Sequence, residues 1–136
     1  MKEQVRHCVI TGAADGIGRA LAHRFGRAGY RVTGIDVDRE RAMYAQAELI
    51  NAGVDARFAL ADLADPRDVE QLLETLAGRP PIDALIHNAG INAAAPFVTS
   101  PLTSMAPVLA VHLAAPPPLT TGRLRSGLLA PARRVR

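Results

Sequence analysis

The sequence has little of several residue types, and each shortage excludes something. It has one cysteine, Cys8, so no disulfide can form within the chain, and we expect a reducing, cytoplasmic location. No apolar run reaches the ~18 residues of a bilayer-spanning helix, so we expect no membrane partner. Met1-Lys2-Glu3 runs almost directly into the first apolar run, so we expect no secretory signal. The four histidines show no metal-ligand spacing, and we expect no metal site.

Acidic residues are missing from the last third of the chain. All thirteen Asp and Glu residues lie at or before Asp83, so residues 84–136 contain five arginines and no acid. The five arginines all lie in residues 116–136 and could pair with nucleic-acid phosphates, but this stretch has no aromatic side chains to stack on bases, and we expect no nucleic acid. Residues 116–136 draw on few residue types, and we expect a basic, disordered tail. We also hypothesise that this tail is read from a shifted frame.

A glycine-rich loop follows the first apolar run, residues 5–10. It reads Thr11-Gly12-Ala13-Ala14-Asp15-Gly16-Ile17-Gly18 and leads into a helical pattern. The first glycine permits a tight turn, the second lets backbone approach a pyrophosphate, and the third lets the helix pack closely. Alternatively, the loop has only a structural role, as a turn that lets the helix pack and binds no ligand. The strand before the loop and the helix after it favour a dinucleotide-binding loop.

Strand and helix patterns alternate along the chain. We expect a helix from the loop to Gly29, further strands over residues 31–35, 56–60 and 82–87, and further helices over residues 38–52, 65–78 and 102–115. Pro116 should end the last helix, and Pro107 conflicts with its interior. The residues expected to face inward are Ile17, Leu21, Phe25 and Ala28 in the first helix, Met43, Ala47 and Ile50 in the second, and Val69, Leu72, Leu73 and Leu76 in the third. This alternation predicts an α/β fold, a doubly wound parallel sheet with helices on both faces.

Three ordered motifs resemble the short-chain dehydrogenase/reductase family. The loop has that family's Thr-Gly-x-x-x-Gly-Ile-Gly spacing, Asp62-Leu63 resembles its adenine contact, and Asn88-Ala89-Gly90 resembles its Asn-Asn-Ala-Gly signature, with His87 in place of the first Asn. His112 stands where the family's fourth helix usually has an Asn. The resemblance covers about residues 5–115. It implies a Rossmann-like, NAD(P)-binding half-domain over residues 1–115, truncated after about four strands in the order 3-2-1-4.

The resemblance implies a set of cofactor-binding residues. They are Gly12, Ala14, Asp15, Gly16, Ile17, Gly18, Asp36, Asp62, Leu63, Asn88, Ala89 and Gly90. Asp36 ends the second strand about 20 residues beyond the loop, where a carboxylate binds ribose hydroxyls and repels the 2′-phosphate of NADP. Asp15 stands where NADP-preferring relatives commonly have a basic residue, and it therefore also favours NAD over NADP. Arg39 argues in the other direction.

The family's catalytic residues are missing. The resemblance implies a Tyr-x-x-x-Lys pair for proton transfer, but the only tyrosines are Tyr30 and Tyr44 and the only lysine is Lys2. We therefore expect no catalytic residue and an inactive chain, with an unknown substrate. Two functions stay open: oxidoreductase activity completed by a partner chain, and non-catalytic dinucleotide binding. The fourth strand should leave an open sheet edge that favours self-association.

Overall fold

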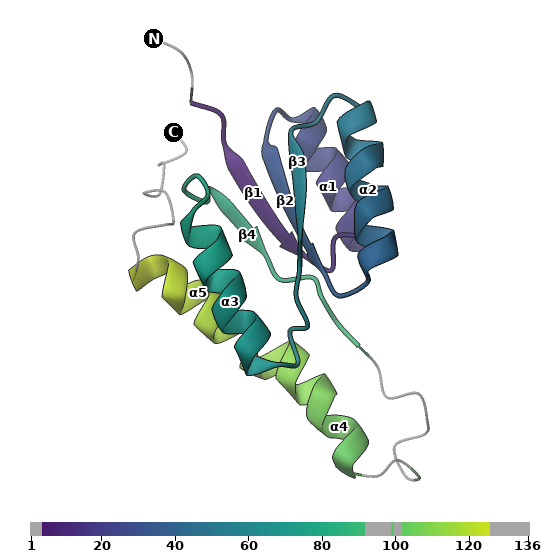
Figure 1. The fold of residues 1–136 in the computed structure, drawn as a ribbon, viewed down its shortest axis with the longest axis vertical. Helices are drawn as coiled ribbons and strands as arrows, with labels where there is room; N and C mark the ends of the chain where they lie inside the picture. Colours follow the sequence, from purple (N-terminus) through teal and green to yellow (C-terminus); the bar gives the residue numbers. More distant parts are fainter. Residues whose placement is uncertain (1–3, 92–98, 100–101, 126–136) are drawn as a thin grey trace, which may run out of the picture.

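The computed structural model describes residues 4–91, 99 and 102–125. Its centre is a parallel sheet of four strands in the order β3-β2-β1-β4 (Figure 1). The strands are β1 His7–Thr11, β2 Arg31–Asp36, β3 Ala56–Leu60 and β4 Ala84–Ile86. The predicted fold class and strand order are confirmed, with strand ends displaced by a few residues at most.

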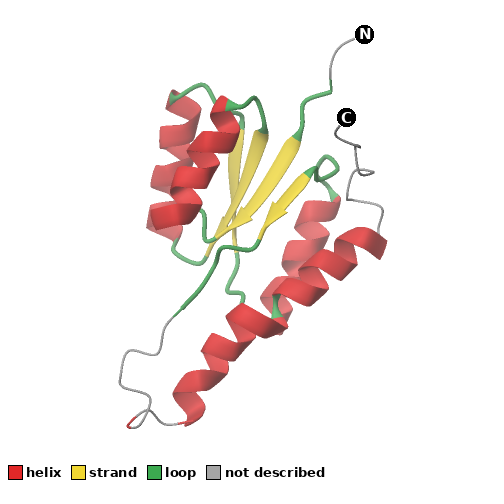
Figure 2. Ribbon diagram, turned by 180° about the vertical axis from the view of Figure 1, so that it is seen from behind, coloured by secondary structure: helices red, strands yellow, loops and turns green. Residues whose placement is uncertain are grey.

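Helices cover both faces of the sheet, as Figures 1 and 2 show from opposite sides. The helix bounds are α1 Gly16–Arg27, α2 Arg39–Asn51, α3 Pro66–Ala77, α4 Leu102–Leu109 and α5 Pro116–Arg125, with a π-helical segment, η2, over Ala110–Ala114. Helices α1 and α2 pack on one face, and α3 with α5 on the other, while α4 extends past the carboxyl ends of the strands. Right-handed crossovers between parallel strands require this arrangement.

Aspartates begin three of the helices. Asp15, Asp38 and Asp65 each cap a helix, and each accepts a hydrogen bond from a backbone N–H of the first turn. Pro66 follows the last of these caps at the first helical position, where its missing N–H has no cost. The predicted start of α3 at Asp65-Pro66 is therefore confirmed.

Two apolar layers sandwich the sheet. The layer on the side of α3 and α5 consists of Val9, Ile35, Ala61, Leu63, Val69, Leu72, Leu76, Ile82, Val111, Ala115 and Leu119. The layer on the side of α1 and α2 consists of Cys8, Ile10, Ala13, Ala22, Val32, Leu49, Val54 and Ala56. Cys8 is a free, fully buried thiol inside β1, and burial raises its pKa to about 12.

The expected inward face of α2 is wrong. Met43, Ala47 and Ile50 are exposed, and the buried side chains are Ala42, Ala45 and Leu49 instead. Both sets have helical spacing, so periodicity alone does not separate them. The two alanines pack with Ala14 and Phe58, and small side chains let α2 lie close to the sheet.

The first helix also buries a different set. Ile17, 73% exposed, and Ala28 face solvent, whereas Gly18 and Ala22 are buried, with Leu21 and Phe25 half-buried beside them. Leu73 of α3 is half-buried, while Val69, Leu72 and Leu76 face the core as predicted.

The region after residue 101 differs from the expected disordered tail. The predicted helix ends before Pro116, but α5 begins at that same proline, because proline is well suited to the first turn of a new helix. Residues 116–125 are helical, and Leu119 is only 2% exposed in the core. Pro107 lies inside α4, ahead of the π-helical segment. Residues 126–136 of the expected tail lie outside the described residues.

Within the described residues, no helix is both long and apolar enough to cross a bilayer.

Candidate cofactor-binding site

Two glycines bring the loop after β1 into close contact with the start of α1. Gly12 has a φ of +65°, a conformation that side chains disfavour, and its N–H donates to the Ile35 carbonyl at 2.7 Å. A Cβ on Gly18 would lie 2.1 Å from the Gly12 carbonyl oxygen and 2.5 Å from Asn88 Nδ2. Because the Gly12 carbonyl belongs to the backbone and cannot swing aside as a flexible side chain can, only glycine fits at position 18. Gly18 is thus a packing residue.

Gly16 has the opposite surroundings. Its φ is +53°, and no atom lies within 4 Å of the place where a Cβ would stand. The residue opens α1, and the Asp15 carboxylate accepts its N–H at 2.8 Å. The loop backbone is therefore open at the helix N-terminus, where unpaired N–H groups and the helix dipole favour an anion.

The Asp36 carboxylate ties the end of β2 to the glycine loop. One oxygen accepts the Ala14 N–H and the other accepts the Asp38 N–H, both at 3.1 Å. Beside it, the exposed guanidinium of Arg41 contacts two carboxylates, Asp15 at 3.0 Å and Asp38 at 3.5 Å. The carboxylate of Asp36 is held in place by these backbone contacts, while Arg41 neutralises its neighbours.

Thr11 and Asn88 join the ends of β1 and β4. The Thr11 hydroxyl accepts the N–H groups of Asn88 and Ala89, both at 3.0 Å. In return, the Asn88 amide donates to the carbonyl oxygens of Thr11 and Gly12, both at 3.2 Å. The sequence prediction included Asn88 but missed Thr11, whose signal is its position directly before the first glycine. These hydrogen bonds hold the ends of β1 and β4 together at the site.

A pocket of about 370 Å³ opens at the carboxyl ends of the strands. The predicted site residues that line it are Gly12, Asp15, Gly16, Asp36, Asp62, Leu63, Asn88, Ala89 and Gly90. Ala14, Ile17 and Gly18 are near the loop but do not line it. The prediction missed the lining residues Ile35, Val37, Arg41, Ala61, Ile91 and Val111, most of which directly neighbour a predicted one in the sequence.

Asp62 and Leu63 form the wall that follows β3. One carboxylate oxygen of Asp62 accepts the Ala64 N–H at 2.9 Å. The backbone N–H of Asp62 donates to the Asp68 carboxylate at 2.8 Å. Leu63 is buried at the base of this turn. The pair therefore presents a fixed polar edge beside an apolar surface, which suits a planar base.

The described residues that line this pocket include three aspartates but no tyrosine or lysine. Tyr30 stacks edge-on against Phe25, and Tyr44 lies exposed on α2 under the Arg19 guanidinium; neither lines the pocket. Lys2 lies outside the described residues. His112 contacts the backbone N–H of Ile91 through Nε2 at 3.1 Å, beside Gly90. No three His, Cys, Asp or Glu side chains cluster for a metal ion in the described part of the chain.

The sheet, the open glycine loop at a helix N-terminus and the fixed carboxylate at the end of β2 define a Rossmann-type α/β protein. The residues present fit a dinucleotide at the switch point between β1 and β4. The chain belongs to the short chain dehydrogenase family, whose sequence profile matches residues 6–126. This confirms the predicted family, and the match extends past the expected limit at residue 115.

The chain resembles several known family members. It is 46% identical over 92 residues to 1-deoxy-11-beta-hydroxypentalenate dehydrogenase of Streptomyces arenae, covering 67% of this chain and 33% of that protein. It is 34% identical over 126 residues to the short chain dehydrogenase/reductase dpchG of Colletotrichum higginsianum, covering 91% and 47%. A metagenomic short-chain oxidoreductase in complex with NADP superposes with a TM-score of 0.81 at 29% identity, covering 89% and 56%. The chain thus spans a third to a half of these two curated relatives, and the family implies NAD(P) as cofactor.

Proposed function

We propose that this 136-residue chain binds a nicotinamide dinucleotide and does not by itself catalyse the family's oxidoreductase reaction. The observation that carries the proposal is the pocket at the carboxyl ends of the strands, bordered by Gly16, Asp36 and Asn88 but by no tyrosine or lysine among the described residues. A general acid or base typically contributes about 10² to 10⁴-fold to a rate, so its absence removes most turnover.

In this proposal each wall of the pocket holds one part of the cofactor. The loop backbone at Gly16 and the N-terminus of α1 hold the pyrophosphate, and Asp36 accepts the ribose hydroxyls. Asp62 and Leu63 border the adenine, while Asn88 to Gly90 border the remainder. A bound nicotinamide cofactor supplies a hydride in the family's reaction, and the residues of this chain bind and orient it.

A preference for NAD over NADP is part of the proposal. The Asp36 carboxylate accepts ribose hydroxyls and repels a 2′-phosphate at the same place. Among the described residues, Arg41 is the one basic residue that lines the pocket, and its guanidinium is already paired with Asp15 and Asp38. The metagenomic neighbour was solved with NADP, so this preference rests on Asp36 and Asp15 and not on the comparison.

Binding is tested by calorimetric titration of the chain with NADH and NADPH. We expect weak NADH binding, because much of the relatives' length has no counterpart here. Gly16→Val should abolish it, since the new side chain fills the open space in front of the loop. Gly29→Val is the matched control, because Gly29 also has a positive φ, +87°, with no atom within 4 Å. Equal NADH affinity in Gly16→Val and Gly29→Val would contradict the role of the glycine loop in binding the cofactor.

The preference is tested on the same titration. Asp36→Asn removes the negative charge and keeps one acceptor oxygen for the loop N–H groups. We expect the NADH-to-NADPH affinity ratio to fall by about tenfold, the effect of about 1.4 kcal/mol. Asp55→Asn, an exposed acid at the other end of the sheet, should leave the ratio unchanged. An unchanged ratio in Asp36→Asn would remove Asp36 from its role.

The second candidate function is oxidoreductase activity completed by another polypeptide. The family match and the half-length coverage of the relatives favour it. A turnover assay with secondary alcohols and ketones separates the two candidates. We expect no turnover by the homogeneous chain with either cofactor. Turnover that disappears in Gly16→Val would contradict the non-catalytic proposal.

A further inference from the structure

The amino ends of the strands, opposite the cofactor pocket, hold a buried polar chain of hydrogen bonds. The His7 Nδ1 atom lies 2.9 Å from the Pro80 carbonyl oxygen, which can only accept, so Nδ1 carries the proton. In the neutral ring Nε2 is then an acceptor, and the Thr33 hydroxyl donates to it at 2.8 Å. Arg79 Nη1 donates to that same hydroxyl oxygen at 3.1 Å.

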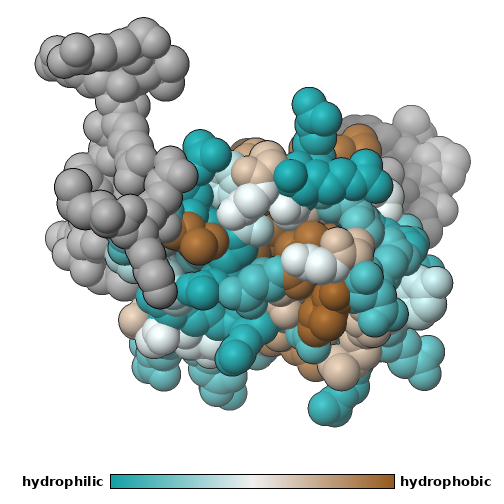
Figure 3. Space-filling model, turned by 90° about the horizontal axis from the view of Figure 1, so that it is seen from above, coloured by the Kyte–Doolittle hydropathy of each residue, from teal (hydrophilic) through white to brown (hydrophobic). Residues whose placement is uncertain are grey.

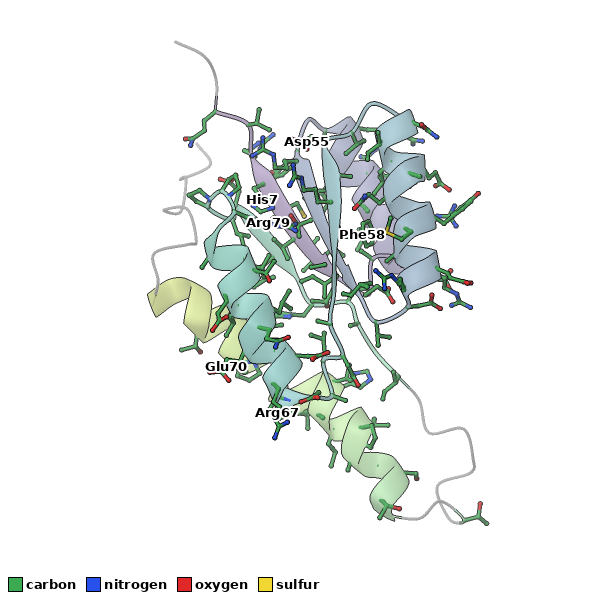
Figure 4. The ribbon with its side chains drawn as sticks, viewed as in Figure 1. His7, Asp55, Phe58, Arg67, Glu70 and Arg79 are labelled. Atoms are coloured by element: carbon green, nitrogen blue, oxygen red, sulfur yellow. The ribbon has the colours of Figure 1, made fainter. Side chains whose placement is uncertain are left out.

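Arg79 is a partly buried cation without a counter-charge. Its guanidinium reaches back from the turn after α3 to β2, and Figure 4 shows it beside His7 between the sheet and α3. Thr33 is its only hydrogen-bond acceptor among the described residues, and no described carboxylate lies within 4.0 Å of it. Burial lowers the pKa of Arg79 below its ordinary value. A partly desolvated charge with unused donors is stabilised by an anionic partner.

A second arginine stands on the same face of the sheet. Arg57 of β3 is the register partner of Thr33, so both side chains point toward the α3 face. Its charge repels that of Arg79, and it too forms no ion pair within the described residues. The neighbouring acid, Asp55, is already bound to Arg31 at 2.7 Å. Figure 3, which looks onto this end, shows mainly hydrophilic side chains around a small apolar area.

We propose that Arg57 and Arg79 form a binding site for a phosphate group at the amino end of the sheet, remote from the cofactor pocket. Planar guanidinium groups bind tetrahedral oxyanions through paired N–H donors, so one phosphate contacts both arginines and relieves their mutual repulsion. Thr33 holds Arg79 in place, and His7 holds Thr33. The site is independent of the proposed function, because none of these residues lines the cofactor pocket.

The test is a titration with inorganic phosphate, followed through the side-chain Nε–H signals of arginine in ¹H–¹⁵N NMR. Chloride at the same ionic strength controls for screening, which is strong for exposed charges. We expect saturable shifts of the Arg57 and Arg79 signals with phosphate and none with chloride. Shifts confined to the amides of residues 12–18 would place the anion at the cofactor loop and overturn the proposal. Glycerol 2-phosphate, titrated in parallel, tells whether the site takes a free phosphate or a phosphate ester; binding of either supports it.

Variants test the two arginines separately. Arg79→Gln and Arg57→Gln should each weaken phosphate binding about tenfold or more, the usual effect of losing a charge-assisted hydrogen bond. The matched control is Arg67→Gln, because Arg67 is exposed at the opposite end of α3 (Figure 4). Phosphate stabilises folded chains in general, so the readout is the difference between variants: it should raise the urea midpoint of the wild-type chain and of Arg67→Gln more than that of Arg79→Gln. Equal phosphate affinity in all three variants would overturn the proposal.

Discussion

At the scale of single residues, His7 links the stability of the fold to pH. The ring is 1% exposed, and its neutral form satisfies both the Pro80 carbonyl and the Thr33 hydroxyl. Burial is the largest cause that lowers its pKa below 6.5, and the charges of Arg31 and Arg79 act in the same direction. The unfolded chain therefore takes up this proton at a higher pH than the folded chain does.

The sign of the pH effect follows from this difference. The stabilisation is complete above pH 6.5 and is lost as the pH falls from 6.5 toward the lower pKa of the folded state. We expect the urea unfolding free energy to be smaller at about pH 5 than at about pH 8, and the His7→Gln variant to have a flatter profile. His87, whose pKa burial also lowers, keeps some dependence in the variant. A His7→Gln profile as steep as that of the wild type would contradict this account.

At the scale of elements, helix α5 contributes to the hydrophobic core, and its contribution to the free energy of unfolding can be measured. Leu119 is 2% exposed and packs in the cluster that includes Val69, Leu72 and Leu76 of α3. Leu119→Ala should lower the free energy of unfolding by about 2 to 5 kcal/mol, the usual cost of truncating a buried leucine. Leu113→Ala is the control, because Leu113 is 66% exposed and its loss should stay within about 0.5 kcal/mol. Equal urea midpoints for the two variants would mean that α5 does not pack on α3.

The sequence predicts strands and helix starts well and the later helices poorly. Asp65-Pro66 and the glycine loop specify their structures locally, through caps and backbone angles, and the predicted helix start and tight turn are confirmed. The buried face of α2 depends instead on how closely it approaches Phe58, which its own pattern does not contain. Helix α5 begins with Pro116, a residue that ends one helix as readily as it starts another.

The candidate site likewise contains residues that the local sequence predicts and residues whose roles depend on distant segments. Glycines and acids mark the loop, Asp36 and Asp62, since their types and spacing are tied to backbone geometry. Thr11 and Arg41 were missed because their roles depend on segments far away in the chain, at Asn88 and Asp15 respectively. Nothing in the sequence near Arg79 signals its contact with Thr33, 46 positions earlier.

At the scale of the whole molecule, the sheet has polar sites at both ends and an open edge at its side. The candidate cofactor pocket lies at the carboxyl ends, and Arg57 and Arg79, which form no ion pair among the described residues, lie at the amino ends. Strand β4 is an edge of the described sheet, and all three of its residues are half-buried. Later in the chain, Leu109 and Leu113 are 53% and 66% exposed, whereas Val111 between them is buried. This edge and these leucines provide the surface for the self-association we propose.

Self-association should therefore depend on both features and on protein concentration. Unpaired strand edges pair with other chains, and exposed leucines add apolar area to such contacts. We expect size-exclusion chromatography with light scattering to give a mass that rises with concentration above that of the 14.4 kDa monomer. The double variant Leu109→Gln, Leu113→Gln should shift the distribution toward the monomer, while Met43→Gln, an equally exposed change on α2, should not. A wild-type chain that stays monomeric at every concentration would show that β4 and the two leucines are covered in solution, and that the association surface is wrongly assigned.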